Sequence, residues 1–175
     1  MKIYKIVLAL SLMAMVSAYA TAQKQKRSFA IVVDPAVMEN CSSSLDHYIS
    51  SVEADGLSTH VIVDQWSIPD SIRTRLQQLY LHDQLEGAVF IGDIPVPMIR
   101  DAQHLTTAFK MDQRRAWDRS SIPSDRFYDD FDLQFEYLKQ DSLQSLLHYY
   151  SLTHEGAQSV ESEIYTARIK PPKYE

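Results

Sequence analysis

Three short apolar runs, each closed by an aspartate and separated by helix-like segments, constrain the fold of this chain more than any other feature. The runs are SFAIVVD at 28–34, THVIVDQW at 59–66 and GAVFIGD at 87–93. Near-continuous apolar runs of this length are typical of strands that are buried on both faces. Their alternation with helices predicts an α/β fold, in which mainly parallel strands are covered by helices.

The segments between the runs carry apolar residues at helical spacing. Residues 36–56 predict one helix that ends at Gly56, and Ser67 opens a second helix. The first apolar stripe is Val37, Cys41, Leu45, Tyr48, Ile49 and Val52, and the second is Ile72, Leu76, Leu79 and Tyr80. Cys41 is the only candidate for a thiolate nucleophile. Its place on the stripe favours a buried core thiol instead.

The second half of the chain has a less regular pattern. Residues 98–124 are polar and irregular, apart from a predicted short helix around 105–110. The alternation in FDLQFEY at 131–137 predicts a strand with one wet face. Asp141 and Gln144 form a capping-box pattern, which predicts a helix with its apolar stripe at Leu143, Leu146, Leu147 and Tyr150. EIYTARI at 163–169 is a fourth candidate core strand.

The aspartates that close the first three runs are candidates for a shared site. In an open α/β sheet, ligands bind in the crevice beyond the carboxyl ends of the parallel strands. We therefore expect Asp34, Asp64 and Asp93 to gather at that edge. Gly92 allows a tight turn there, and two nearby prolines lead the chain away from the sheet. The alternative is that each aspartate only caps a loop or a helix N-terminus.

The N-terminus has the layout of a secretory signal peptide. Two lysines precede an apolar run at 6–16, and small residues follow at Ala18, Ala20 and Ala22. We expect cleavage after Ala22, which places the protein outside the cytoplasm, secreted or periplasmic. A short basic segment at 23–27 then precedes the domain. A membrane anchor is the alternative, but it normally needs about 20 apolar residues. We expect no membrane span after cleavage.

Charge and ligand types exclude several classes of function. Removal of Lys2 and Lys5 leaves 15 basic and 23 acidic residues, a formal charge of −8. Nucleic acid is therefore a poor partner, because its phosphates need clustered Lys and Arg. The six histidines show no close metal spacing. The acidic run Asp129, Asp130 and Asp132 is the one candidate cofactor site, for calcium, because hard cations favour clustered carboxylates. A solvated strand face is the alternative.

Three segments together resemble the N-terminal region of gingipain-type cysteine peptidases and their secreted relatives. They are Gly92-Asp93 at a strand end, Ser124-Asp125 with Tyr128, and Glu163-Ile164 with Arg168-Ile169. The resemblance covers about 29–169. It implies a caspase-like, three-layer α/β sandwich over 28–170, with a mainly parallel sheet, and a cleft for a peptide or protein substrate. Asp93 and Asp125 are the candidate cleft residues.

The resemblance assigns no catalytic residue to this chain. In that family the catalytic histidine and cysteine follow further strands, downstream of the segment that matches Arg168-Ile169. We therefore expect a scaffold that forms one wall of the substrate cleft, without hydrolytic activity, in an incomplete domain that ends in a truncated tail at 171–175. Otherwise, the last strand is an edge strand.

Two other classes of function stay open. One is a non-catalytic extracellular module that binds a protein or glycan through Trp117, Phe127, Tyr128 and Phe131. The other is a phosphoacceptor receiver domain, which export disfavours because phosphodonors are cytosolic.

Overall fold

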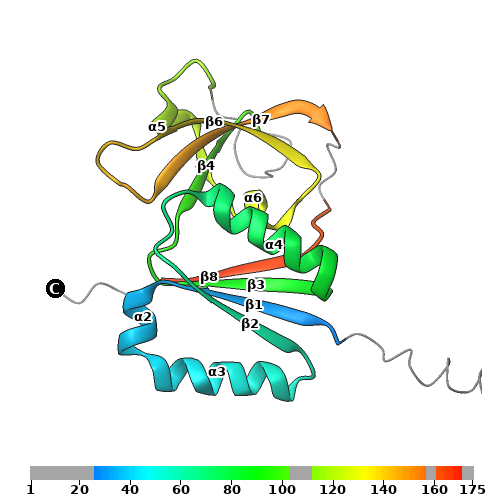
Figure 1. Cartoon of the computed structure of the whole chain (residues 1–175). Helices are drawn as coiled ribbons and strands as arrows, with labels where there is room; N and C mark the ends of the chain where they lie inside the picture. The colour runs from blue at the N-terminus through cyan, green and yellow to red at the C-terminus, as the bar shows by residue number, and fades with distance from the viewer. Residues whose placement is uncertain (1–25, 103–111, 157–160, 171–175) are drawn as a thin grey trace, which may run out of the picture.

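The computed structural model describes residues 26–102, 112–156 and 161–170, which form two four-stranded sheets with helices around them (Figure 1). The elements are β1 Ser28–Val33, α2 Pro35–Asn40, α3 Ser42–Ala54, β2 Ser58–Val63, α4 Pro69–Asp83, β3 Leu85–Ile91, β4 Val96–Arg100, α5 Trp117–Ser120, β5 Ile122–Pro123, α6 Arg126–Asp129, β6 Leu133–Gln140, β7 Leu147–Gly156 and β8 Tyr165–Ile169. The predicted signal peptide, the helix at 105–110, the tail at 171–175 and most of the segment at 23–27 lie outside the described residues.

The first sheet, sheet A, confirms the predicted α/β class. Its order is β2-β1-β3-β8, and every neighbouring pair is parallel. Val33 at the end of β1 is in register with Val63 of β2 and with Ile91 of β3. The carboxyl ends of these three strands therefore lie level with one another, at one edge of the sheet.

The two faces of sheet A are buried by different layers, as alternate residues of β1 show. Phe29, Ile31 and Val33 pack in a cluster with Leu45 of α3. Ala30 and Val32 belong to a larger cluster on the other face. That cluster contains the α4 stripe Ile72, Leu76 and Leu79. Figure 1 shows α3 and α4 on opposite sides of the sheet. A strand buried on both faces is mainly apolar, which explains the run FAIVV that follows Ser28.

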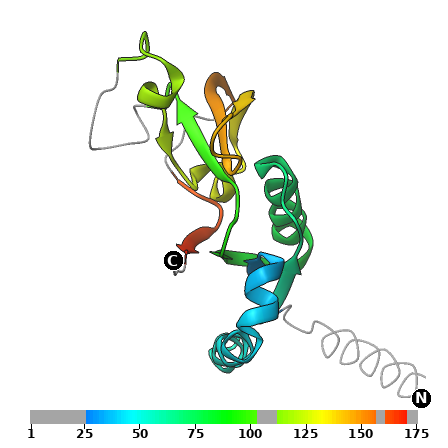
Figure 2. The ribbon, with the colours of Figure 1, turned by 90° about the vertical axis from the view of Figure 1, so that its left-hand side faces the viewer.

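The second sheet, sheet B, was not predicted. Its order is β5-β4-β7-β6, with β4 parallel to β7 and the other two pairs antiparallel. Sheet B and α3 lie on opposite sides of sheet A (Figure 2). Its inner side chains Tyr150 and Leu152 share one core with Phe90 of β3. The mixed sheet therefore adds a layer to the parallel one.

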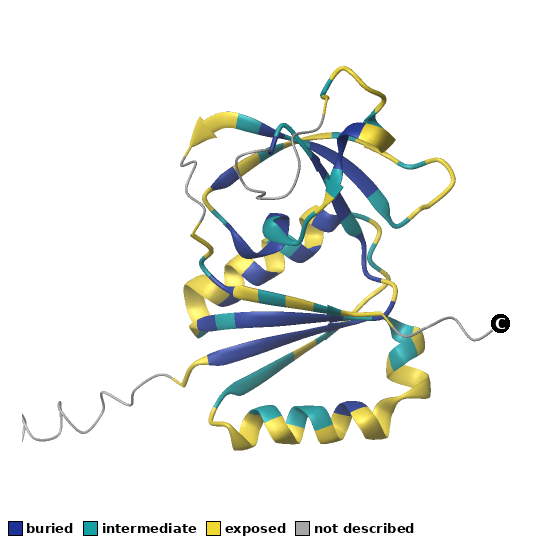
Figure 3. Ribbon diagram, turned by 180° about the vertical axis from the view of Figure 1, so that it is seen from behind, coloured by how far each residue is buried: buried dark blue, intermediate teal, exposed yellow. Residues whose placement is uncertain are grey.

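The single helix predicted over 36–56 is wrong. The chain forms α2 and α3, with Cys41 between them at φ −128°. The Asp34 side chain accepts a hydrogen bond from Val37 N and so fixes the start of α2. The break moves Cys41 off the buried stripe, and the thiol is exposed. The prediction of a buried core thiol is therefore also wrong. Figure 3 shows how little of α2 is buried.

The helix predicted from Asp141 is wrong as well. The Asp141 carboxylate accepts hydrogen bonds from Leu143 N and Gln144 N, but these bonds close a turn, and the chain continues as strand β7. Consecutive buried residues of β7, His148, Tyr149 and Tyr150, face both sides of sheet B. The strand predicted over 131–137 exists but runs over Leu133–Gln140.

Two further differences concern strands. The segment 98–124, predicted to be irregular, contains the end of β4, the short helix α5 and strand β5, and β4 begins directly after Pro95. EIYTARI does form a strand parallel to β3, but it is an edge strand of sheet A. Tyr165 and Ile169 are consequently 54% and 49% exposed. No helix within the described ranges has both the length and the apolar character that crossing a bilayer requires.

Candidate functional site

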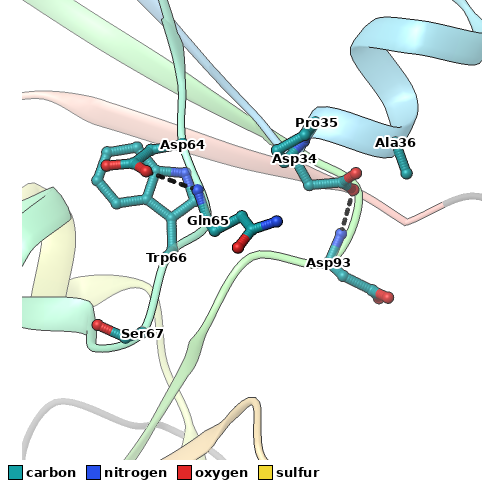
Figure 4. Close-up of a pocket in the computed structure, with 8 residues that line it drawn as sticks. All are labelled: Asp34, Pro35, Ala36, Asp64, Gln65, Trp66, Ser67 and Asp93. Carbon is teal, nitrogen blue, oxygen red and sulfur yellow. Dashed lines mark hydrogen bonds between the residues drawn. The ribbon is translucent and has the colours of Figure 1, made fainter.

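A pocket of about 440 Å³ opens where β1, β2 and β3 end. We call it the rim pocket. Its lining residues are Asp34, Pro35, Ala36, Asp64, Gln65, Trp66, Ser67 and Asp93 (Figure 4). The three aspartates that close the apolar runs therefore lie around one pocket, at the predicted edge of the sheet.

The Asp34 carboxylate joins two of the backbone segments that border the rim pocket. It accepts one hydrogen bond from Val37 N at 3.0 Å and another from Asp93 N at 2.7 Å (Figure 4). The first bond caps α2, and the second joins the end of β1 to the turn after β3. The capping alternative is therefore right for Asp34, whose oxygens are already occupied by backbone donors.

This arrangement explains why a glycine precedes Asp93. Gly92 has φ +95°, and a Cβ atom on it would overlap the Asp34 carboxylate. The Gly92 N–H also donates to Ile169 O, which joins the ends of β3 and β8. Only glycine allows the backbone to pass this close to Asp34 in a left-handed conformation.

Asp64 and Asp93 are the accessible carboxylates of the pocket. Asp64 accepts a hydrogen bond from its neighbour Gln65 N at 2.7 Å, and Asp93 forms an ion pair of 3.4 Å with Lys170. The side chains of that ion pair are 51% and 53% exposed, so water weakens it. A cationic ligand that reaches Asp93 would compete with one solvated lysine.

Trp66 forms the aromatic wall of the pocket. Its indole packs partly against the main core, and Figure 4 shows it beside Asp64. The Trp66 Nε1 atom is buried, and none of the described residues hydrogen-bonds to it. In the sequence Trp66 only ends an apolar run, two residues after Asp64. An indole beside carboxylates suits an organic cation.

Asp125, the second predicted cleft residue, lies outside the lining of the rim pocket. Its two oxygens accept hydrogen bonds from Arg168 Nη2 at 2.7 Å and Nε at 3.2 Å. Arg168 also donates to the carbonyls of Ile94 and Pro95. Asp125 therefore balances the charge of Arg168, which hydrogen-bonds the two backbone carbonyls that follow Asp93 in the sequence.

The three segments of the family resemblance converge at this arginine. Arg168 comes from the third segment, Asp125 from the second, and Ile94 follows Gly92-Asp93 of the first. Tyr128 is fully buried and donates its hydroxyl to Pro95 O at 2.9 Å. Residues that are far apart in sequence thus form one hydrogen-bonded unit behind the rim pocket.

The predicted calcium ligands do not form a common ligand set. Asp129 Oδ2 accepts the Thr166 hydroxyl, whereas Asp130 pairs with Arg126 at 3.0 Å and accepts Leu133 N. Asp132 is exposed. Within the described ranges, no group of three or more His, Cys, Asp or Glu is arranged to hold a metal.

Asp129 has an unusual pKa that makes stability depend on pH. Burial raises the pKa of its carboxyl from 3.8 to about 6, although Thr166 and Arg126 oppose the shift. Well below pH 4, the carboxyl is protonated in both the folded and the unfolded state. The raised pKa therefore lowers stability progressively from about pH 4 to about pH 6, and by a constant amount above that.

We expect Asp129→Asn to raise the free energy of unfolding at pH 7 by about 2 kcal/mol and to have little effect at pH 4. Urea unfolding of both proteins from pH 4 to pH 7 measures the difference. The comparison with wild type is needed because burial lowers the pKa of His148, which acts in the opposite direction. Exposed Asp132→Asn is the control. An equal gain at both pH values would contradict the assignment.

The aromatic residues of the alternative binding module do not share a surface. Phe127 and Tyr128 are at most 1% exposed, and Phe131 packs against Tyr80 at a ring distance of 5.4 Å. Trp117 lies close to two cations, Arg100 at 5.9 Å and Lys139 at 5.2 Å from its ring centroid. These four residues therefore offer no common platform for a glycan.

No protein-family model, no curated protein and no solved structure matches this chain.

Proposed function

We propose that this chain is a secreted polypeptide-binding domain of caspase-like fold, and that it forms the N-terminal wall of a gingipain-like substrate cleft. The observation that carries the proposal is the rim pocket, in which the carboxyl ends of three parallel strands gather Asp34, Asp64 and Asp93. In open α/β sheets this edge is where ligands bind.

The pocket chemistry favours a basic side chain as the occupant. Among the described residues, its lining carries three carboxylates and no lysine or arginine. Asp34 is occupied by backbone donors, which leaves Asp64 and Asp93 to meet a cation. A lysine or arginine side chain of a bound polypeptide supplies that cation, and its alkyl stem packs against Trp66.

The role is binding and positioning, without bond cleavage by this chain alone. Cys41 is exposed at the break between α2 and α3, and it is not among the residues that line the rim pocket. The described residues that line the pocket include no thiol or imidazole that would act as nucleophile or base. The resemblance likewise assigns no catalytic residue to this chain.

The test is the affinity for a neutral-background peptide with one central lysine, measured by calorimetry at low salt. We expect the double variant Asp64→Asn/Asp93→Asn to bind at least about tenfold more weakly, because it loses both charge-assisted contacts. Added salt should weaken wild-type binding, because the carboxylates are exposed. The matched control is Asp46→Asn/Asp118→Asn, which changes the charge equally at exposed positions outside the pocket.

Two results would contradict the proposal. One is equal binding by the two double variants, which would place the peptide elsewhere. The other is thiol-dependent peptide turnover that Cys41→Ala abolishes, which would make the chain a peptidase in its own right.

A further inference from the structure

A second pocket lies next to the rim pocket, between the start of β4 and the turn that joins β6 to β7. Its volume is about 290 Å³. The lining residues are Val96, Leu143, Gln144, Ser145, Leu146, Leu147 and Lys170. Four of the seven are aliphatic, whereas three aspartates line the rim pocket. We call it the turn pocket.

We propose that the turn pocket is an apolar subsite for the same polypeptide, and that it accepts a leucine- or phenylalanine-sized side chain close to the basic residue. This inference rests on the proposed function. It adds a preference for an apolar side chain, which the carboxylates of the rim pocket do not provide.

The turn that forms the pocket is held by a dense set of hydrogen bonds. Asp141 Oδ1 accepts from Leu143 N and Gln144 N, each at 2.9 Å, and Asp141 Oδ2 accepts from Tyr149 Oη. Gln140 Nε2 donates to Ser145 O at 2.6 Å. A pocket wall fixed in this way is already organised, so a ligand need not order it on binding.

Leu143 is a large apolar side chain of this turn that stays exposed to solvent. Its exposed fraction is 92%, the highest among the large hydrophobic residues in the described ranges that are exposed. The Asp141 bonds hold it there, since they fix the backbone on both sides of the leucine's Cα. A bound apolar side chain would remove its own surface and that of Leu143 from water, which stabilises the complex.

The two pockets adjoin at one ion pair. Asp93 lines the rim pocket, Lys170 lines the turn pocket, and the two side chains are 3.4 Å apart. Val96 of the turn pocket follows Asp93 by three residues. An extended peptide whose cation faces Asp64 and Asp93 therefore passes Lys170 and reaches the turn pocket. The charges of the rim pocket set the peptide's position, and the turn pocket adds contact area.

The experiment compares two series of lysine peptides by calorimetry. In one series a leucine is placed one, two or three residues from the lysine on either side, and in the other an asparagine takes its place. We expect the best leucine peptide to bind about tenfold more tightly than its asparagine partner. Leu143→Gln should abolish the preference. Leu81→Gln should keep it, because Leu81 is also exposed, at 67%, but lies on α4 outside both pockets.

The outcomes separate the two proposals. Lysine-dependent binding with no preference for leucine at any spacing overturns the turn pocket and leaves the rim pocket in place. A preference that survives Leu143→Gln also overturns it, since the apolar contact then lies elsewhere. The absence of lysine-dependent binding in both series overturns the proposed function, and the subsite with it.

Discussion

Arg168→Met is expected to lower the free energy of unfolding by about 3 kcal/mol, one of the two largest single effects that this structure implies. Methionine keeps much of the arginine stem but removes all the hydrogen bonds to Asp125, Ile94 and Pro95. The Arg168 and Asp125 side chains are only 20% and 24% exposed, so water replaces little of what is lost. The cation also lies over the Phe90 ring, 5.1 Å from its centroid. Urea unfolding at pH 7 measures the loss.

The matched control is Arg114→Met. Arg114 also pairs with an aspartate, Asp112 at 3.0 Å, but its side chain is 91% exposed. Its removal should not change the unfolding midpoint, because solvated ion pairs contribute little. Asp125→Asn should lose a similar amount to Arg168→Met, and the two losses should not add when combined. A loss for Arg168→Met no larger than that of the control would show that the three segments are not joined as described.

Gly92→Ala is expected to lower the free energy of unfolding by about 3 kcal/mol. The substitution combines two costs. Alanine is strained at φ +95°, and its Cβ would overlap the Asp34 carboxylate and crowd Val37. The carboxylate must then move, which weakens its bonds to Val37 N and Asp93 N. Thermal and urea unfolding both measure this effect.

The chain contains a close control for the Gly92 substitution. Gly56 has the same φ of +95°, but no atom lies within 4 Å of the position its Cβ would take. Gly56→Ala should therefore cost only about 1 kcal/mol, the strain alone. Asp34→Ala should cancel part of the excess cost of Gly92→Ala when the two are combined, because the overlap disappears. Equal losses at the two glycines would contradict the packing of Asp34 against Gly92.

The parts of the fold that the sequence predicted correctly depend on local patterns. The runs that became β1 and β3 are almost wholly buried, so nearly every position along them is apolar. Because the strands are parallel and in register, their aspartates came together without any further information. The rim pocket was therefore predictable from three residue positions.

The wrong predictions come from sequence patterns that are compatible with two different secondary structures. Leu143, Leu146, Leu147 and Tyr150 fit a helical stripe, yet the first of them is at a turn tip and the last is in β7. Asp141 caps a helix and an Asx-type turn with the same bonds. The stronger signal was HYYSLT, a β-prone run that continues past the expected helix.

The remaining features of the site depend on long-range contacts. Nothing near Asp125 in the sequence identifies Arg168 as its partner, 43 residues later. Cys41 is exposed because the chain breaks there between α2 and α3. Whether β8 lies inside the sheet or at its edge depends on what pairs beside it, and no local pattern encodes that.

An NMR titration of the ¹⁵N-labelled protein with the lysine peptide tests the central claim most directly, because it reports where the ligand binds. The account predicts that the largest amide shifts occur together at Asp34, Ala36, residues 64–67 and Asp93, the residues that line the rim pocket. Shifts that avoid these residues and gather around Trp117 on sheet B, or that follow no strand end, would contradict it.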